Sequence, residues 1–362
     1  MRERRLRVAL VYGGRSAERE VSLMSARAVS AALDQDKYEL VLIGIDAEGR
    51  WSLDAASGGA IAESAGPAGL RLALTPDGAD RELILKGSDA SLRGVDLIFP
   101  VLHGPCGEDG SIQGLARLAD LPCVGADILG SALCMDKDAA KRMLREAGMA
   151  VAPFVAFSSM ARARSAWPEV QAALGRDLFV KPANLGSSVG VSRARSGEEY
   201  EAALELAFHY DVKVLVEKRM EGREIEVAVL GHRESRASLP GEVVPRDGYY
   251  SYEAKYLDED GARIIAPAEL KAGEGEACMR AALDACRALC VRGMARVDMF
   301  LGWSGRPVVN EVNTIPGFTA RSMFPLLWEA SGMGLPRLVD ELIESALEAH
   351  AERAALWSAP PS

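Results

Sequence analysis

The start of the chain is the feature that most constrains its fold. An apolar run, Leu6–Tyr12, leads directly into Gly13-Gly14, and a segment with apolar residues at helical spacing follows. A strand, a tight glycine turn and a helix in this order predict an α/β unit built on a parallel sheet. We expect Ser16 to cap this helix and the helix to extend to Asp34. One face of the helix is predicted to carry Val21, Met24, Ala28 and Leu33.

The length of 362 residues exceeds what one core usually supports, so several domains are expected. We place them at residues 1–130, 131–217 and 218–362. The 42 Lys and Arg against 52 Asp and Glu give a net charge of −10, which argues against a nucleic-acid partner. A hydrophobic content of 49% is ordinary for a globular protein, and no apolar run approaches the ~20 residues of a membrane span. We therefore expect neither a nucleic-acid nor a membrane partner.

The six cysteines show no paired Cys-x-x-Cys spacing. Buried free thiols are the favoured interpretation, with a metal site or a disulfide as the alternatives. Free thiols are typical of a reducing compartment, so a cytoplasmic location is expected. The cysteines are Cys106, Cys123, Cys134, Cys278, Cys286 and Cys290.

Further elements follow from apolar runs, caps and breakers. A variable excursion between strands covers residues 46–91. The other predicted strands are Val95–Leu102, Val151–Phe157, Leu178–Lys181, Val214–Glu217, Glu224–Leu230, Arg296–Leu301 and Pro307–Asn313. The other predicted helices run from a cap at Asp136 to Ala147, over Glu198–Phe208, from about Ser322 to Ala330 and from Pro336 to Ala355.

A lysine at a strand end is followed by a Gly- and Ser-rich loop over Lys181–Gly190. Such a loop can close over a polyphosphate, since its backbone N–H groups form a concavity that binds anions. Its spacing is not that of a Walker loop. A surface hairpin with a flexible tip is the alternative.

Two carboxylates and an amide lie near the ends of two predicted strands, at Asp298, Glu311 and Asn313. Because side chains alternate along a strand, all three are expected on one face. Oxygen ligands of this kind suit Mg²⁺, and the apolar flanks imply burial, which makes an unpaired carboxylate pair costly. A solvent-facing acidic edge is the alternative.

A third set of charged residues indicates a binding site only in combination with the Gly- and Ser-rich loop, because each residue alone is usually a solvated surface charge. Its lysines could neutralise a triphosphate, and Glu217 could accept from a ribose or a base. The set comprises Lys137, Lys181, Glu217, Lys218 and Glu224.

In combination, six sequence blocks resemble the D-alanine–D-alanine ligases, in family order over roughly residues 6–345. The blocks are Gly13–Ser22, His103–Gly114, Met135–Lys137, Lys181–Gly190, Tyr252–Tyr256 and Asn310–Thr319. The resemblance implies an ATP-grasp fold of class α/β, in which an N-terminal parallel α/β domain precedes two domains that clamp ATP.

The resemblance also implies the reaction. ATP phosphorylates the carboxylate of one D-alanine, and the amine of a second D-alanine displaces phosphate to form D-alanyl-D-alanine for peptidoglycan precursor synthesis. The implied partners are therefore two D-alanines and ATP, with two Mg²⁺ ions, for which Mn²⁺ can substitute, and a homodimer is a family expectation. No nucleophilic Ser-His-Asp or Cys-His set is needed for this reaction.

Roles for individual residues come from the same resemblance. The implied catalytic set is Glu18, Ser187, Tyr256, Arg296 and the backbone N–H of Gly317, the last two as an oxyanion hole. The implied ATP-binding set is Lys137, Lys181, Ser187, Ser188, Glu217, Lys218, Glu224, Lys255 and Asn310. The implied Mg²⁺ ligands are Asp298, Glu311 and Asn313. The implied substrate contacts are Glu18, His103, Lys255, Arg296, Gly317, Ser322 and Met323.

Three other functions are considered. A ligase that makes D-alanyl-D-lactate or D-alanyl-D-serine has the same fold, and Phe in place of Tyr256 would favour the depsipeptide. A non-catalytic ATP-binding module is disfavoured, because it need not keep Arg296 together with the metal ligands. A Rossmann dehydrogenase is disfavoured, because Gly13-Gly14 lacks the G-x-G-x-x-G spacing.

Overall fold

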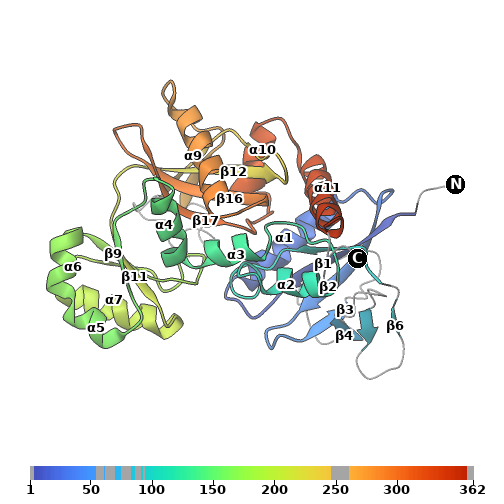
Figure 1. Cartoon of the computed structure of the whole chain (residues 1–362), viewed down its shortest axis with the longest axis horizontal. Helices are drawn as coiled ribbons and strands as arrows, with labels where there is room; N and C mark the ends of the chain where they lie inside the picture. Colours follow the sequence, from blue (N-terminus) through green and yellow to red (C-terminus); the bar gives the residue numbers. More distant parts are fainter. Residues whose placement is uncertain are drawn as a thin grey trace, which may run out of the picture.

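The computed structural model describes residues 4–53, 61, 70–74, 83–85, 91–92, 94–245 and 261–356. Within this part of the chain, three β-sheets follow one another along the sequence, each accompanied by helices. Figure 1 shows the middle sheet with α5, α6 and α7 at one end of the molecule and the N-terminal sheet at the other. The domain boundaries at 130 and 217 stay predictions.

The first sheet has seven strands in the order β6-β5-β4-β3-β2-β1-β7. Within this sheet, β1 pairs in parallel with β2 and with β7. The other strand pairs are antiparallel, so the prediction of a parallel sheet is wrong for β3 to β6. A parallel neighbour needs a long crossover, which α1 provides between β1 and β2, whereas β2 returns to β3 through a short turn. Its elements are β1 (Leu6–Gly13), α1 (Arg19–Ala32), β2 (Tyr38–Ile45), β3 (Trp51–Leu53), β4 (Leu70–Leu74), β5 (Leu83–Leu85), β6 (Ser91–Leu92), β7 (Leu97–Pro100), α2 (Ser111–Leu118) and α3 (Ile128–Met135).

The turn between β1 and α1 depends on Gly13. Its φ is +91°, and a Cβ placed there would lie 2.2 Å from the carbonyl oxygen of Ile45 on the neighbouring strand. Because Gly has no Cβ, β1 can approach β2 this closely and the chain can turn toward the helix. The turn thereby places the N-terminus of α1 near the carboxyl end of β1.

Helix α1 differs from its prediction in both its start and its buried face. It begins at Arg19 after Glu18, and Ser16 accepts the Glu18 N–H instead of capping the helix. Met24 is 41% exposed, so the predicted face is wrong at this position. Two serines occupy part of the actual buried face, and a pattern based on apolar residues cannot detect them. The buried residues are Val21, Ser22, Leu23, Ser25, Ala26 and Val29.

The second sheet is antiparallel throughout, in the order β10-β9-β11-β8, and it has its own core between residues 157 and 216. Helices α5, α6 and α7 pack around this core. Its elements are β8 (Phe154–Phe157), α5 (Met160–Ser165), α6 (Trp167–Leu174), β9 (Leu178–Pro182), β10 (Ser192–Ala194), α7 (Gly197–Tyr210) and β11 (Val214–Lys218).

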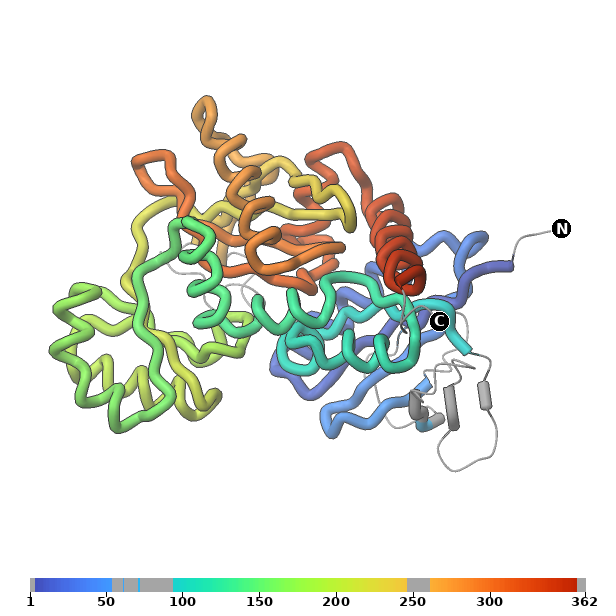
Figure 2. The backbone as a smooth tube through the Cα atoms, in the orientation of Figure 1, coloured from blue at the N-terminus to red at the C-terminus, as the bar shows by residue number. Residues whose placement is uncertain are grey.

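The third sheet is also antiparallel, in the order β15-β14-β12-β16-β17, with β13 beside β12. It shares a hydrophobic core with the first sheet, because α10 and α11 pack on both. Figure 2 shows α11 alongside the N-terminal part of the chain, and α11 contacts α1. Its elements are β12 (Arg223–Gly231), β13 (Arg236–Ala237), β14 (Gly241–Pro245), β15 (Ala262–Ile265), α9 (Glu274–Ala288), β16 (Gly293–Leu301), β17 (Pro307–Asn313), α10 (Met323–Ala330) and α11 (Leu335–Ala354).

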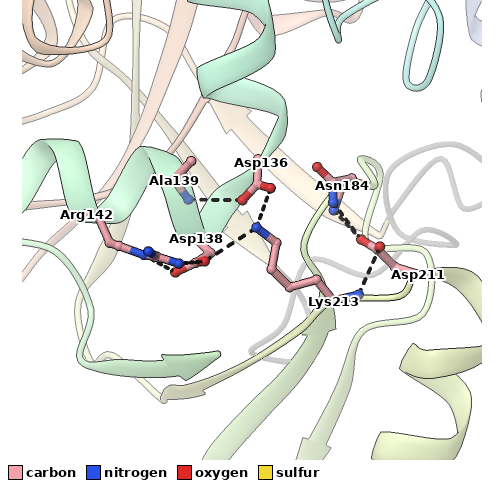
Figure 3. Close-up of polar contacts among 7 residues, drawn as sticks. All are labelled: Asp136, Asp138, Ala139, Arg142, Asn184, Asp211 and Lys213. Atoms are coloured by element: carbon pink, nitrogen blue, oxygen red, sulfur yellow. Dashed lines mark hydrogen bonds and ion pairs between the residues drawn. The ribbon is translucent and has the colours of Figure 1, made fainter. Parts of the chain in front are cut away.

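Helix α4 (Lys137–Glu146) is fastened to the second sheet by charged contacts, which Figure 3 shows. The Asp136 side chain accepts the Ala139 N–H, which confirms the predicted cap. Lys213 Nζ lies 2.5 Å from Asp136 and 3.4 Å from Asp138. Asp211 accepts both the backbone and the side-chain N–H groups of Asn184. These contacts hold the start of α4 beside the loop that follows β9.

All six cysteines are free thiols, which agrees with the favoured interpretation, although Cys106 and Cys290 are exposed and Cys123 is half-buried. Burial raises the pKa of Cys123 and of Cys286 to about 12 each. Among the helices of the described residues, none is both long and apolar enough to cross a membrane.

Candidate active site

Two cavities meet at the junction of the three sheets. The larger, of about 720 Å³, lies between α1 and the segment after β17, and the smaller, of about 290 Å³, lies between the second and third sheets. Ser187, Glu226 and Glu311 line both cavities. A group bound in one cavity can therefore reach a group bound in the other.

Paired strands β16 and β17 supply the charged wall between the cavities. Asp298 pairs with Glu311 and Arg296 pairs with Asn313, and the register shifts directly after Asp298. Asn310 lies at this bulge, and both Asn310 and its neighbour Glu311 line the smaller cavity. The prediction that Asp298 faces Glu311 is confirmed.

Arg296 is half-buried among acidic groups. Its guanidinium makes two hydrogen bonds of 2.7 Å to the two oxygens of Asp298, and its Nε lies 2.8 Å from Glu226. Burial alone would lower the pKa of Arg296, but Asp298 and Glu226 outweigh it and raise that pKa well above its ordinary value. Arg296 therefore stays charged, beside the acids and at the wall of the larger cavity.

The predicted Mg²⁺ ligands form a hard-oxygen set that fits such an ion. Asn313 donates to Asp298 at 3.0 Å, and Lys137 Nζ lies 3.6 Å from Glu311. Arg296 and Lys137 already balance part of the negative charge, so burial alone does not require a metal here, contrary to the argument from sequence. Among the described residues, no three His, Cys, Asp or Glu side chains form a metal-binding group, and the third predicted ligand here is an amide. Two carboxylates and one amide oxygen beside substrate phosphates still suit Mg²⁺.

A buried triad of charges lies beside the smaller cavity. Glu217 on β11 lies 2.7 Å from Lys181 Nζ and 3.2 Å from Lys141 Nζ, and Lys141 is only 1% exposed. Burial lowers the pKa of Lys141 to about 8, although Glu217 opposes this shift. Burial would raise the pKa of Glu217, but Lys141 and Lys181 outweigh it and lower that pKa. The carboxylate of Glu217 is thus engaged by two lysines while it lines the smaller cavity, and its contact with a ribose or a base stays a prediction.

The Gly- and Ser-rich loop closes over the boundary between the cavities. Ser187 donates a short hydrogen bond to Glu18, and Lys137 Nζ donates to the carbonyl of Leu185 at 2.6 Å. Ser187 and Ser188 have φ values of +51° and +59°, which non-glycine residues rarely adopt. The loop is therefore held in a turned conformation against α1 and α4.

The segment after β17 forms the far wall of the larger cavity. Gly317 and Ser322 line it, and Ser322 accepts the Thr319 N–H at 3.0 Å. His103 lines the same cavity and makes a 2.9 Å bond from Nδ1 to the carbonyl oxygen of Ile315. Burial lowers the pKa of His103.

Most predicted site residues line one of these two cavities. Those at the larger cavity are Glu18, His103, Ser187, Arg296, Glu311, Asn313, Gly317, Ser322 and Met323. Those at the smaller cavity are Lys137, Lys181, Ser187, Ser188, Glu217, Lys218, Glu224, Asp298, Asn310 and Glu311. Lys255 and Tyr256, with the loop Tyr249–Tyr256, lie outside the described residues.

Sequence reasoning missed four polar residues around the site: the buried Ser25, Lys141 and Glu226 and the half-buried Glu108. Burial and the neighbouring carboxylate of Glu18 raise the pKa of Glu108, which accepts backbone N–H groups of Gly104 and Ile315. Glu224 and Glu226 are two residues apart on β12, so their side chains lie on the same face of the strand. This spacing was a signal for a second acid at the site. Nothing in the local sequence distinguishes Ser25 or Lys141.

The fold and this site together define a class. A cleft between two antiparallel sheets, with a second cavity reaching the same acidic residues, is the arrangement of ATP-grasp enzymes. Family models described as the N-terminus and the C-terminus of D-ala D-ala ligase match residues 7–126 and 143–344.

Individual proteins agree with the family models. The D-alanine–D-alanine ligase A of Escherichia coli (strain K12) is 47% identical over 358 residues, 97% of this chain and 98% of that protein. The structure of the D-alanine–D-alanine ligase from Coxiella burnetii aligns with a TM-score of 0.83 at 34% identity, over 97% of each chain. That of the VanG D-Ala:D-Ser ligase from Enterococcus faecalis aligns with a TM-score of 0.86 at 36% identity, over 95% of this chain and 100% of that one. This chain belongs to the D-alanine–D-alanine ligase family, which confirms the predicted resemblance and the ATP-grasp fold.

Proposed function

We propose that this chain joins two D-alanines to D-alanyl-D-alanine at the expense of ATP, through a D-alanyl phosphate. The observation that carries the proposal is the pair of cavities that share Glu311, Ser187 and Glu226, in a chain of this family. One cavity suits a nucleotide and the other suits two small amino acids. A carboxylate is a poor acyl donor and has to be activated by ATP. This is the chemical reason why the two cavities adjoin.

The nucleotide is proposed to lie in the smaller cavity. Lys137 on α4 and Lys181 on β9 line this cavity and offset phosphate charge. Ser187 and Ser188 belong to the loop that covers it. Glu217 fixes Lys181 through their 2.7 Å contact and so positions this lysine. Lys218, Glu224 and Asn310 line the same cavity and are assigned to ATP binding. Lys255 is assigned to it from the family resemblance.

Mg²⁺ is proposed to be held by Asp298, Glu311 and Asn313. Bound there, it would supply charge stabilisation and orientation for the phosphate oxygens. Arg296 holds Asp298 in place through two hydrogen bonds and keeps the acidic wall compact. We further propose that two ions bind, with Mn²⁺ able to replace Mg²⁺.

The two D-alanines are proposed to lie in the larger cavity. Glu18, fixed by Ser187, offers a carboxylate for the ammonium of the first D-alanine. Arg296 and the N–H of Gly317 line the position where the tetrahedral intermediate would develop negative charge. Ser322 and Met323 border the second D-alanine, with Lys255 and Tyr256 assigned there by family resemblance.

The test is phosphate release from ATP with D-alanine, L-alanine, D-serine or D-lactate offered separately. The expected result is release with D-alanine alone and formation of the dipeptide. No release with D-alanine would contradict the proposal, and equal release with L-alanine would contradict the assigned stereochemistry.

A second candidate is ligation of D-alanine to D-serine, which the likeness to the VanG D-Ala:D-Ser ligase favours. The same assay distinguishes it, since D-alanine and D-serine together would give a mixed dipeptide at a higher rate than D-alanine alone. A D-lactate product would be expected with Phe at position 256, and this chain has Tyr256. The homodimer and the cytoplasmic location stay predictions from the sequence.

A further inference from the structure

The segment that contains Gly317 is fastened to α1 by one buried serine. Ser25 is fully buried on α1, and its Oγ lies 3.1 Å from the backbone nitrogen of Phe318. The same Oγ lies 3.2 Å from Nε2 of His103. His103 in turn bonds through Nδ1 to the carbonyl oxygen of Ile315 at 2.9 Å. Ser25 and His103 therefore hold both ends of the stretch from residue 315 to 318.

The chemistry of these groups fixes the direction of each hydrogen bond. The carbonyl of Ile315 can only accept, so Nδ1 of His103 carries a proton. The N–H of Phe318 can only donate, so Ser25 Oγ accepts from it. The single hydroxyl proton of Ser25 is then directed to Nε2, which accepts it in the neutral imidazole. This arrangement satisfies all four groups only while His103 is neutral.

The surroundings of His103 keep it in that state. Burial lowers its pKa, and the positive charge of Arg296 acts in the same direction. The Glu18 carboxylate and the hydrogen bond to the Ile315 carbonyl act in the opposite direction without outweighing burial, and Glu108 accepts the Ile315 N–H on the other side of the segment. The neutral ring can thus serve as a fixed link between Ser25 and Ile315.

Gly317 lies inside the stretch that is held at both ends. A Cβ on Gly317 would lie 2.6 Å from Ser322 Oγ, so the backbone passes close to the loop that follows. Gly317 lines the larger cavity together with Arg296. A shift of the 315–318 backbone would displace Gly317 relative to Arg296 in this cavity.

We propose that Ser25 is a positioning residue, which fixes the backbone N–H of Gly317 toward the reacting carboxyl group through Phe318 and His103. This inference rests on the proposed function for the role of Gly317. Ser25 touches neither substrate, so its effect on catalysis is exerted through the segment it holds. Glu18 and Ser187 are held by separate contacts and are not part of this network.

The first experiment compares Ser25→Ala with Ser22→Ala. Ser22 lies on the same helix, is equally buried, and also makes two hydrogen bonds, to the Gly13 N–H and the Val101 carbonyl, but none to residues 315–318. Ser25→Ala leaves the Phe318 N–H without its acceptor, and kcat for D-alanine is expected to fall about tenfold or more. The KM for ATP is expected to stay unchanged, because the ATP cavity is not touched. Ser22→Ala is expected to lower stability comparably while kcat stays within about twofold.

A kcat within twofold of the unmodified protein in Ser25→Ala would overturn the proposal. So would an equal loss of kcat in both variants, since that would indicate a general effect of destabilising α1. The hydroxyl-retaining variant Ser25→Thr should recover part of the lost kcat.

A second measurement on the unmodified protein needs no activity and no variant. With only four histidines in the chain, ¹⁵N NMR can assign the His103 ring. The expected state is neutral, with the proton on Nδ1 and a hydrogen-bonded, unprotonated Nε2, and with slow exchange of the Phe318 amide. A proton on Nε2, or rapid exchange of that amide, would overturn the network even if ligation of D-alanine is demonstrated. Conversely, absence of ligase activity with the expected NMR signals would contradict the proposed function and leave the hydrogen-bond network intact.

Discussion

At the scale of single residues, the site is built from buried charges that are balanced within the chain. Arg296 pairs with both Asp298 and Glu226, and Lys141 shares Glu217 with Lys181. Removing one partner from such a pair leaves an uncompensated buried charge, which costs more than the pair contributes. Single substitutions here therefore test the charge balance directly.

The pH dependence of stability should reveal Lys141. Its pKa is about 8 in the folded protein against 10.5 for an ordinary lysine, so the unfolded chain binds more protons between these values. Stability should therefore rise with pH from about 8 to 10.5, by on the order of 3 kcal/mol for this group. Lys141→Met should lose this rise, and urea denaturation across the pH range measures it. Lys271→Met, at an exposed lysine, is the control and should keep the rise.

Glu311→Gln tests the metal assignment. The change removes one negative charge between the two cavities, and the rate is expected to fall about 10²–10³-fold while the protein stays folded. Calorimetry should also show that Mg²⁺ no longer strengthens ATP binding as it does in the unmodified chain. Glu348→Gln, at an exposed glutamate on α11, is the control. Unchanged kinetics in Glu311→Gln at ordinary Mg²⁺ would contradict the assignment.

At the scale of elements, turns and bulges decide where functional side chains lie. Gly13 allows β1 to turn toward α1, whose N-terminus carries Glu18. Asn310 lies at the bulge beside Asp298 and lines the same cavity as Glu311. The left-handed residues Ser187 and Ser188 fold the loop back onto Glu18.

Gly13→Ala should be far more destabilising than Gly148→Ala. Both glycines have positive φ, +91° and +77°, so a left-handed alanine costs roughly 1–2 kcal/mol at either position. At Gly148 nothing lies within 4 Å of the added Cβ, whereas at Gly13 the Ile45 oxygen lies at 2.2 Å and the backbone must move. The expected loss at Gly13 exceeds about 4 kcal/mol. Denaturant titration of both variants checks this, and equal losses would show that the close approach to Ile45 is not maintained.

At the scale of the whole molecule, the three sheets are not equally connected. The first and third share one hydrophobic core, which runs from Val8 on β1 to Ala346 on α11. The second sheet has a separate core, so its attachment depends on the polar contacts around α4 and the loop after β9. The smaller cavity, where ATP is proposed to bind, lies at this junction.

Amide hydrogen exchange should therefore respond differently to an ATP analogue and to D-alanine. Without nucleotide, amides of residues 154–218 are expected to exchange through openings that leave the shared core protected. A non-hydrolysable ATP analogue should slow exchange in this unit and in the loop Gly186–Gly190, because it bridges the second and third sheets. D-Alanine alone, in the cavity between α1 and the segment after β17, should have a smaller effect there. Equal exchange of the loop with and without the analogue would contradict closure.

The sequence alone determined those features that depend on neighbouring residues. Alternation predicted β17 at Pro307–Asn313 to the residue, and Asp136 with its side-chain acceptor predicted the start of α4. Motif order predicted the family, which the comparisons confirm. Most predicted site residues also lie together, although their roles stay predictions.

Tertiary structure decided what depends on residues far apart in the chain. The buried face of α1 follows from contacts across about 290 positions, such as Ser25 with Phe318, so its serines carry no local hydrophobic signal. Glu217 is engaged by Lys141 and Lys181 because α4 packs beside β9 and β11, and no spacing in the sequence encodes that pairing. β3 runs antiparallel to β2 because a short turn joins them in place of a long crossover. Local patterns set the elements, but burial and charge pairing are properties of the packed chain, and these decided which polar residues surround the site.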